Sequence, residues 1–304
     1  MLKLLDQHET PQITTTSRTH QIVICHALLE GFEQEASRKR PFLAGSAKTE
    51  ATQHGSLLVT SCMLAYTRDF MLPRFDEICT AVLALTENPR PLIRLEVVRL
   101  VPRLARRCPG VFGRRYLDRS LAFLIQSAAT PSPVRVGVVD IRPSAYTAIG
   151  QLILAMTDTK SGLVIGGQSL PTVKIIERDG SRGGFTVELS KSGIIYDKLG
   201  EIFSLVKMGL QSGAENEILS PALKCAANLV QALNDMALPY ISDLINDIFR
   251  AGLTHDLISA LHAIAQFVPE QQSNIENRLL QETSLIVGPK QRCCCFGCMD
   301  ISEY

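Results

Sequence analysis

The chain has 304 residues, enough for one or two ordinary domains or for an array that grows by repetition. Its hydrophobic content of 46% excludes a largely disordered protein, and its formal net charge of +1 predicts no overall attraction to nucleic acid or membranes. No apolar run approaches the roughly 20 residues that would cross a bilayer, and no signal-peptide core is present, so we expect a soluble, cytoplasmic protein without a transmembrane segment.

Amphipathic helices are the first elements in chain order. We expect residues 1–17 to be disordered and residues 18–156 to form HEAT-like repeats, because apolar residues recur there with the period of a helix. Within this block the pattern predicts helices over 18–38, 53–67, 74–85, 91–107 and 112–126. Prolines between them stand where a helix can begin, since the backbone donor that proline lacks would be unpaired in a first turn.

The helical period then disappears, and residues 157–192 read as an insertion. Residues 172–177 and 185–189 are rich in β-forming side chains, and the glycines and aspartate between them suit a turn, so we expect a β-hairpin. HEAT-like repeats resume over residues 193–287, with helices predicted over 194–210, 221–234, 238–252, 254–268 and 271–287. Gly252 is placed to end the third of these helices.

Two of the predicted helices repeat one apolar stripe 160 positions apart. The first stripe comprises Ile93, Val97, Leu100, Val101, Leu104 and Ala105, and the second comprises Leu253, Leu257, Ala260, Leu261, Ile264 and Ala265. Because a stripe buries only one face of a helix, such helices must stack on neighbours. Repeat starts about 35 to 37 residues apart fall between tetratricopeptide and HEAT units, and the absence of tryptophan favours HEAT. The prediction is an all-α, HEAT-like helical-repeat solenoid, an α-α superhelix with a small hairpin insertion.

Enzymatic machinery is not recognisable. The glycines near residue 165 do not follow a strand and open a helix as phosphate binding requires, and no kinase, hydrolase or zinc-protease motif occurs. We therefore expect no catalytic, cofactor-binding or metal-binding residues and a chain that is not itself an enzyme.

Cysteines fall into two sets. Five are scattered singly among helices and are expected to be buried free thiols: Cys25, Cys62, Cys79, Cys108 and Cys225. Four more stand between 293 and 298 in a tail, residues 288–304, that we expect to be flexible. Three interpretations of this tail stay open: a sequence without a selected role, a site of S-acylation, and half of a metal site.

A basic segment, residues 90–119, is the candidate contact surface. It holds nine arginines against Glu96 and Asp118, a formal charge of +7. The candidate partner-binding residues are Arg99, Arg103, Arg106, Arg107, Arg114, Arg115 and Arg119. An acidic protein surface is favoured over nucleic acid, because no aromatic residues are interleaved to stack on bases. The alternative is a solvated flank whose charges pair with neighbouring repeats.

The order of the helices resembles the N-terminal HEAT region of the target of rapamycin (TOR) kinases. The resemblance runs through residues 54–59, 70–83, 92–105, 112–125 and 251–287. It implies a serine/threonine kinase parent whose catalytic domain lies outside this chain, so no catalytic residue is carried over. It also implies a curved scaffold that binds a raptor-type adaptor, contacts other repeats of the parent chain and supports a dimeric complex.

Three departures from the family pattern suggest a fragment or an imperfect gene model: the insertion, the Cys-rich end and the abrupt start. The leading hypothesis is a non-catalytic scaffold segment of TOR signalling. The alternative is a transport-receptor-like or nucleic-acid-binding helical solenoid that uses the same basic segment.

Overall fold

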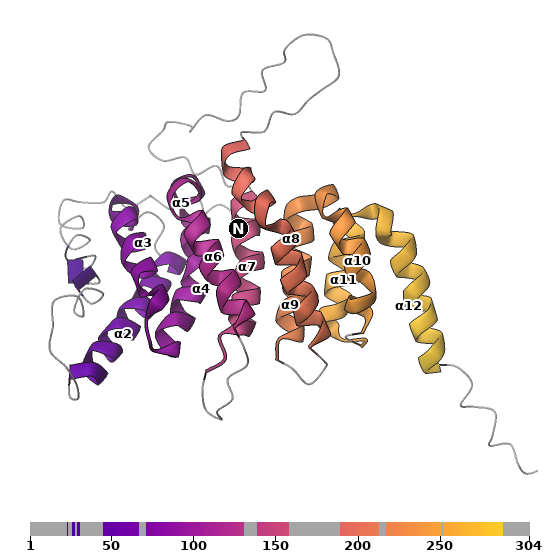
Figure 1. The fold of residues 1–304 in the computed structure, drawn as a ribbon, viewed down its shortest axis with the longest axis horizontal. Coiled ribbons are helices and arrows are strands. Elements are labelled where there is room, and N and C mark those ends of the chain that lie inside the picture. Colours follow the sequence, from indigo (N-terminus) through magenta and orange to yellow (C-terminus); the bar gives the residue numbers. More distant parts are fainter. Residues whose placement is uncertain are drawn as a thin grey trace, which may run out of the picture.

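A computed structural model describes residues 45–66, 71–130, 139–157, 189–212, 217–250 and 252–287, with five isolated positions between 23 and 30. Every regular element in these ranges is helical, and the helices stand side by side from α2 at one end to α12 at the other (Figure 1). The predicted all-α, helical-repeat fold is therefore confirmed. The predictions for residues 1–17, the segment 158–188 and the tail 288–304 concern residues outside the described ranges.

The described helices are named in chain order. They are α2 (Gly45–Tyr66), α3 (Phe75–Ala84), α4 (Pro91–Arg107), α5 (Pro109–Arg115), α6 (Leu117–Ala129), α7 (Arg142–Thr157), α8 (Leu189–Gln211), α9 (Leu219–Leu233), α10 (Leu238–Phe249), α11 (His255–Phe267) and α12 (Gln272–Val287). Four 3-10 turns lead into or out of them: η1 (Leu72–Arg74), η2 (Leu85–Glu87), η3 (Asn234–Ala237) and η4 (Pro269–Gln271).

The helices form two layers. In one layer α2, α4, α7, α9 and α11 pack in that order, each against the next. In the other, α6 packs on α8 and α8 on α10, while α6, α8 and α12 also pack across the layers against α7, α9 and α11 respectively. Each repeat thus contributes one helix to each layer, which is how an α-solenoid buries the apolar face of every helix.

The apolar stripes form the core between these layers. All six residues of the first stripe are inaccessible in α4, as are Leu257 and Ile264 of the second stripe in α11. The prediction was wrong for Leu253, which is 41% exposed because it precedes the first turn of α11. Ala265 is only half-buried, since α11 is the last helix of its layer in the described part of the chain.

One predicted helix is divided in the structure. The single helix expected over 112–126 is two helices, α5 and α6, which break at Tyr116 where φ is −123° and ψ is −16°. The Tyr116 hydroxyl donates a hydrogen bond to the Asp76 carbonyl oxygen at 3.1 Å, which ties the break to α3. α5 begins at Pro109, because proline suits a first helical turn.

Helices include both ends of the segment predicted as an insertion, residues 157–192. α8 begins at Leu189, so residues 189–192, assigned to the insertion and in part to a strand, are helical, and Thr157 is the last residue of α7. Strand preferences of single residues are weak, and at Leu189 the helix prevails. α10 ends at Phe249, three residues before the predicted stop at Gly252, whose φ of +71° is a left-handed conformation that glycine adopts without strain.

Candidate protein-docking surface

The predicted arginines divide into two groups. Arg99, Arg103 and Arg106 are spaced at i, i+4 and i+7 along α4, so they follow one flank of that helix, and all three are exposed. Arg107 lies beside them at the last turn and is half-buried. Arg114, Arg115 and Arg119 belong to α5 and α6. The structure therefore does not gather all seven residues at one place.

Two α4 arginines are anchored by neighbouring side chains. An Arg99 Nη1 donor is 2.8 Å from Glu96 Oε1, and the Glu96 side chain is only 9% exposed. An Arg103 Nη1 donor bonds to Ser61 Oγ of α2. Since a guanidinium carries five N–H donors, each arginine is held in position by one bond and keeps further donors for a partner.

The α5–α6 arginines are bound back to α3. Arg115 forms an ion pair with Asp76, and Arg119 Nη2 donates to the Leu83 carbonyl oxygen at 2.9 Å. The Leu83 carbonyl stands in the last turn of α3, where a helix leaves carbonyls unpaired. These two arginines join neighbouring repeats, as the alternative interpretation of the basic segment expected, while Arg114 is exposed.

A hollow of about 340 Å³ lies where α4, α7 and α9 meet. Arg99, Pro102 and Arg103 of α4 form one wall. The opposite wall comes from α7, whose polar contributors are Ser144, Thr147 and Gln151, and Pro221 of α9 closes one end. The lining contains no carboxylate. Arg99 and Arg103, two of the predicted arginines, thus line a hollow together with α7 residues that the sequence analysis did not identify.

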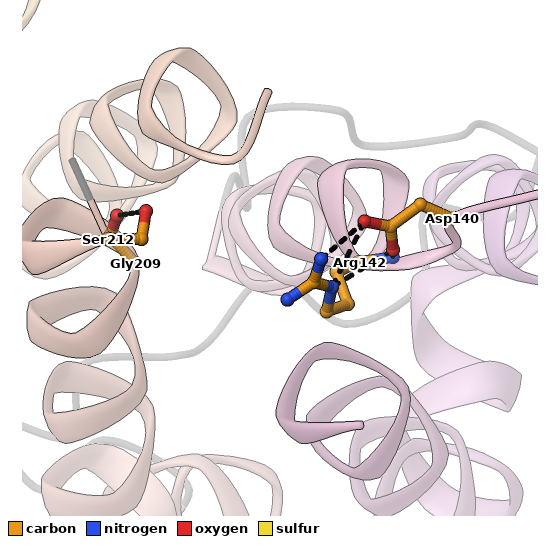
Figure 2. Close-up of polar contacts among 4 residues, drawn as sticks. All are labelled: Asp140, Arg142, Gly209 and Ser212. Carbon is orange, nitrogen blue, oxygen red and sulfur yellow. Dashed lines mark hydrogen bonds and ion pairs between the residues drawn. The ribbon is translucent and has the colours of Figure 1, made fainter. Parts of the chain in front are cut away.

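The start of α7 is fixed by an ion pair (Figure 2). Arg142 donates to Asp140 from its backbone nitrogen at 3.0 Å, from Nε at 3.0 Å and from Nη2 at 2.6 Å. Burial by itself raises the Asp140 pKa, but the hydrogen bonds from Arg142 outweigh burial, so the pKa lies below its ordinary value. This fork holds the first turn of α7, and with it Pro143 and Ser144, at the edge of the hollow.

Close helix packing supports the α7 wall from behind. A Cβ on Gly150 of α7 would lie 3.0 Å from the Cα of Cys225, and a Cβ on Gly209 of α8 would lie 2.9 Å from Cζ of Tyr146. The Tyr146 hydroxyl donates to the Leu205 carbonyl oxygen at 3.0 Å, and burial raises its pKa to about 12. Sequence reasoning missed these positions, although glycine inside a helix is a known signal of close approach.

The described cysteines are free thiols in different surroundings. Cys79 and Cys225 are buried, and burial raises the pKa of both thiols, that of Cys225 to about 12. Cys108 is half-buried, but Cys62 is exposed, so the expectation of burial was wrong there because Cys62 faces outward from α2. Cys25 lies outside the described residues.

The described part of the chain contains neither a metal cluster nor a membrane-spanning helix. No three His, Cys, Asp or Glu side chains there come together in a way that could hold a metal ion. None of the described helices is both long enough and apolar enough to span a membrane.

No protein-family model matches the chain. Its sequence is 24% identical over 235 residues to the serine/threonine-protein kinase TOR of Arabidopsis thaliana, and 24% identical over 228 residues to that of Oryza sativa subsp. japonica. It is also 24% identical over 237 residues to the serine/threonine-protein kinase tor1 of Schizosaccharomyces pombe.

These alignments cover 77%, 75% and 78% of this chain but only 8% of each relative. The chain thus corresponds to a small part of much longer proteins. In the described residues, this part is a stack of helices. The chain is similar to a small part of the TOR serine/threonine kinases, as its resemblance predicted.

Proposed function

We propose that this chain is a non-catalytic scaffold segment of a TOR-like kinase, which docks a raptor-type adaptor in the cytoplasm and supports assembly of the kinase complex. The observation that carries the proposal is the α4 flank, where exposed arginines are anchored on a stack of helices related to TOR kinases. A rigid array presents such a flank without the cost of ordering a loop when the partner binds.

The adaptor binds through acidic residues that meet Arg99, Arg103 and Arg106. Because all charges on this flank are positive, they speed the diffusional encounter with an acidic partner and orient it for docking. Arg115 and Arg119 instead hold α3 against α5 and α6, so their contribution to docking is indirect.

Charge reversal on the flank tests this proposal. The 304-residue chain and its Arg103→Glu/Arg106→Glu variant are titrated against purified raptor-type adaptor from the same organism by biolayer interferometry. We expect the variant to bind at least about tenfold more weakly, the scale of charged interface pairs, while its circular dichroism spectrum is unchanged. Absence of adaptor binding by the unaltered chain would contradict the proposed function itself.

The second candidate is a solenoid that binds nucleic acid or transport cargo through the same arginines. The density of arginine on α4 favours it, but the hollow beside them has no aromatic lining on which a base could stack. Binding to nucleic acid would weaken steeply with added salt, because each phosphate contact releases counterions. A salt titration with a single-stranded oligonucleotide therefore separates the two candidates.

A further inference from the structure

We infer that the hollow between α4, α7 and α9 is a binding site for a short acidic segment of a protein partner, whose carboxylates bond to Arg99 and Arg103. This inference rests on the proposed docking function and names the place and the chemistry of the contact. It separates Arg99 and Arg103, which line the hollow, from the other five candidate arginines, which do not.

Charge is the first argument. Arg99 and Arg103 both line the hollow, and no carboxylate does. Buried Glu96 offsets part of the charge on Arg99. Arg103, in contrast, bonds to a neutral hydroxyl on Ser61 and keeps its full charge. A ligand that matches this imbalance is an anion, and a carboxylate fits the planar fork of a guanidinium.

The second argument is preparation of the site before binding. Ser61 of α2 and Glu96 of α4 already hold the two guanidinium groups. Fixing a long side chain in advance removes part of the entropy that would otherwise be lost on binding. Among the described residues, no side chain fixes Arg106 or Arg114 by a hydrogen bond or an ion pair. Binding an anion there would therefore cost more side-chain entropy than binding it at Arg99 and Arg103.

The third argument concerns the α7 wall. Pro143 and Ser144 lie in the first turn of α7, whose N-terminal end carries partial positive charge. The Gln151 amide, two turns further along the same wall, can donate to a peptide carbonyl. Pro102, Pro143 and Pro221 add apolar surface without backbone donors, which suits the stems of acidic side chains.

Size limits the occupant. At about 340 Å³ the hollow is near the lower end of the ~300–1,000 Å³ of ligand sites. It accommodates one or two side chains of a segment that crosses it, with the rest of the partner outside. We therefore assign it to an extended acidic peptide segment and not to the helix face of a folded partner.

The test measures fluorescence anisotropy of a fluorescein-labelled hexaglutamate peptide titrated with the 304-residue chain. The Arg99→Gln/Arg103→Gln variant is compared with Arg114→Gln/Lys207→Gln, which removes the same charge from exposed positions on α5 and α8. We expect the first variant to lose about tenfold or more in affinity, from the loss of charge-assisted hydrogen bonds, and the second to lose less than about threefold. Equal losses in the two variants would overturn the inference.

A third variant, with unchanged net charge, separates occupation of the hollow from misfolding and from a long-range effect of charge. Gln151→Trp keeps the net charge and fills the hollow from a half-buried position on α7. We expect it to weaken hexaglutamate binding as strongly as the arginine double variant, with an unchanged circular dichroism spectrum. Full binding by this variant contradicts the inference, and so does preferential binding of an oligothymidylate with the same number of charges.

The adaptor assay separates the two levels of the argument. If the unaltered chain binds adaptor and Arg99→Gln/Arg103→Gln binds it equally well, the docking function stands and the hollow is the wrong site. If the hollow binds hexaglutamate but the chain does not bind adaptor, the inferred chemistry stands and the proposed partner is wrong.

Discussion

Gly150 shows how a single atom sets the distance between α7 and α9. A Cβ there would meet the Cα of Cys225 and the Cβ of Asn228, both at 3.0 Å. Backbone cannot yield as a flexible side chain can, so Gly150→Ala must push the two helices apart. We expect it to lower the free energy of unfolding by about 1–3 kcal/mol, the usual cost of overpacking.

Gly200 provides the matched control for this prediction. It lies within α8, and a Cβ added there would meet nothing within 4 Å. Gly200→Ala should therefore stabilise the chain by about 0.5–1 kcal/mol through helix propensity alone. Urea denaturation followed by circular dichroism measures both changes. A stabilising Gly150→Ala would show that α7 and α9 pack less closely than the structure indicates.

Asn234 adopts a backbone conformation that side chains disfavour. It caps the C-terminus of α9 with φ at +49° and ψ at −127°, and its side chain is exposed. Glycine reaches this region without steric cost. We expect Asn234→Gly to stabilise the chain by roughly 1 kcal/mol, the low end of the strain stored at such positions. A thermal melt checks this, and Asn234→Ala should move the melting temperature in the opposite direction.

The start of α7 shows how an element is fixed by charge. The folded-state pKa of Asp140 is depressed, so its contribution to stability is present above the ordinary value of 3.8 and is lost as pH falls through the folded pKa. Asp140→Asn should cost about 1–2 kcal/mol at neutral pH, since bonds to a charged group become bonds to a neutral one.

Urea denaturation between pH 2 and 7 measures this effect. The variant should lose less stability than the unaltered chain as pH falls, because one depressed carboxyl is missing. Glu77→Gln is the control, since this exposed carboxylate forms a surface ion pair with Arg74. An unchanged acid dependence in Asp140→Asn would mean that the fork does not stabilise α7.

Three of the bonds between neighbouring repeats span the same number of positions. Arg119 bonds to the Leu83 carbonyl, Gln211 to Asp247, and Ser220 to Asp256, and in each case the partners are 36 positions apart. This period agrees with the 35 to 37 residues read from the sequence. The junction of α7 and α9 departs widely from this period, with Gly150 meeting Cys225 across 75 positions, because residues 158–188 intervene.

Element boundaries were predictable where local chemistry marks them. α4 has the predicted bounds, because Pro91 suits its first turn and Pro109 begins the next helix. The sequence pattern did not predict α7. Its apolar residues, such as Ala145, Ile149 and Leu152, belong to a broad surface that contacts α4, α6 and α9. A helix surrounded on several sides has no polar face to produce a period.

At the scale of the whole molecule, α11 and α12 leave apolar surface uncovered. Ile258 of α11 corresponds, 160 positions on, to Val98 of α4, yet it is 56% exposed and Val98 is inaccessible. Val98 is covered because α7 follows α4 in the layer, whereas α11 is the last helix of its layer among the described residues. Leu280 and Leu285 of α12 are 68% and 71% exposed.

We expect this surface to make the isolated chain self-associate as concentration rises, because exposed apolar patches drive association. Ile258→Gln/Leu285→Gln should shift the weight-average mass in sedimentation velocity towards the monomer. Met236→Gln, at an equally exposed position in η3, is the control and should change nothing. A chain that stays monomeric without these substitutions would contradict the prediction.

The sequence by itself determined the helical-repeat class, the bounds of α4 and the arginine flank, because these follow from short-range spacing along one helix. Only the tertiary structure decided which arginines are available. Ser61, Asp76 and Leu83 stand about 36 to 42 positions before their arginine partners, and no local pattern indicates that they meet. The hollow likewise exists only after α4, α7 and α9 stack, because each helix contributes one side of it.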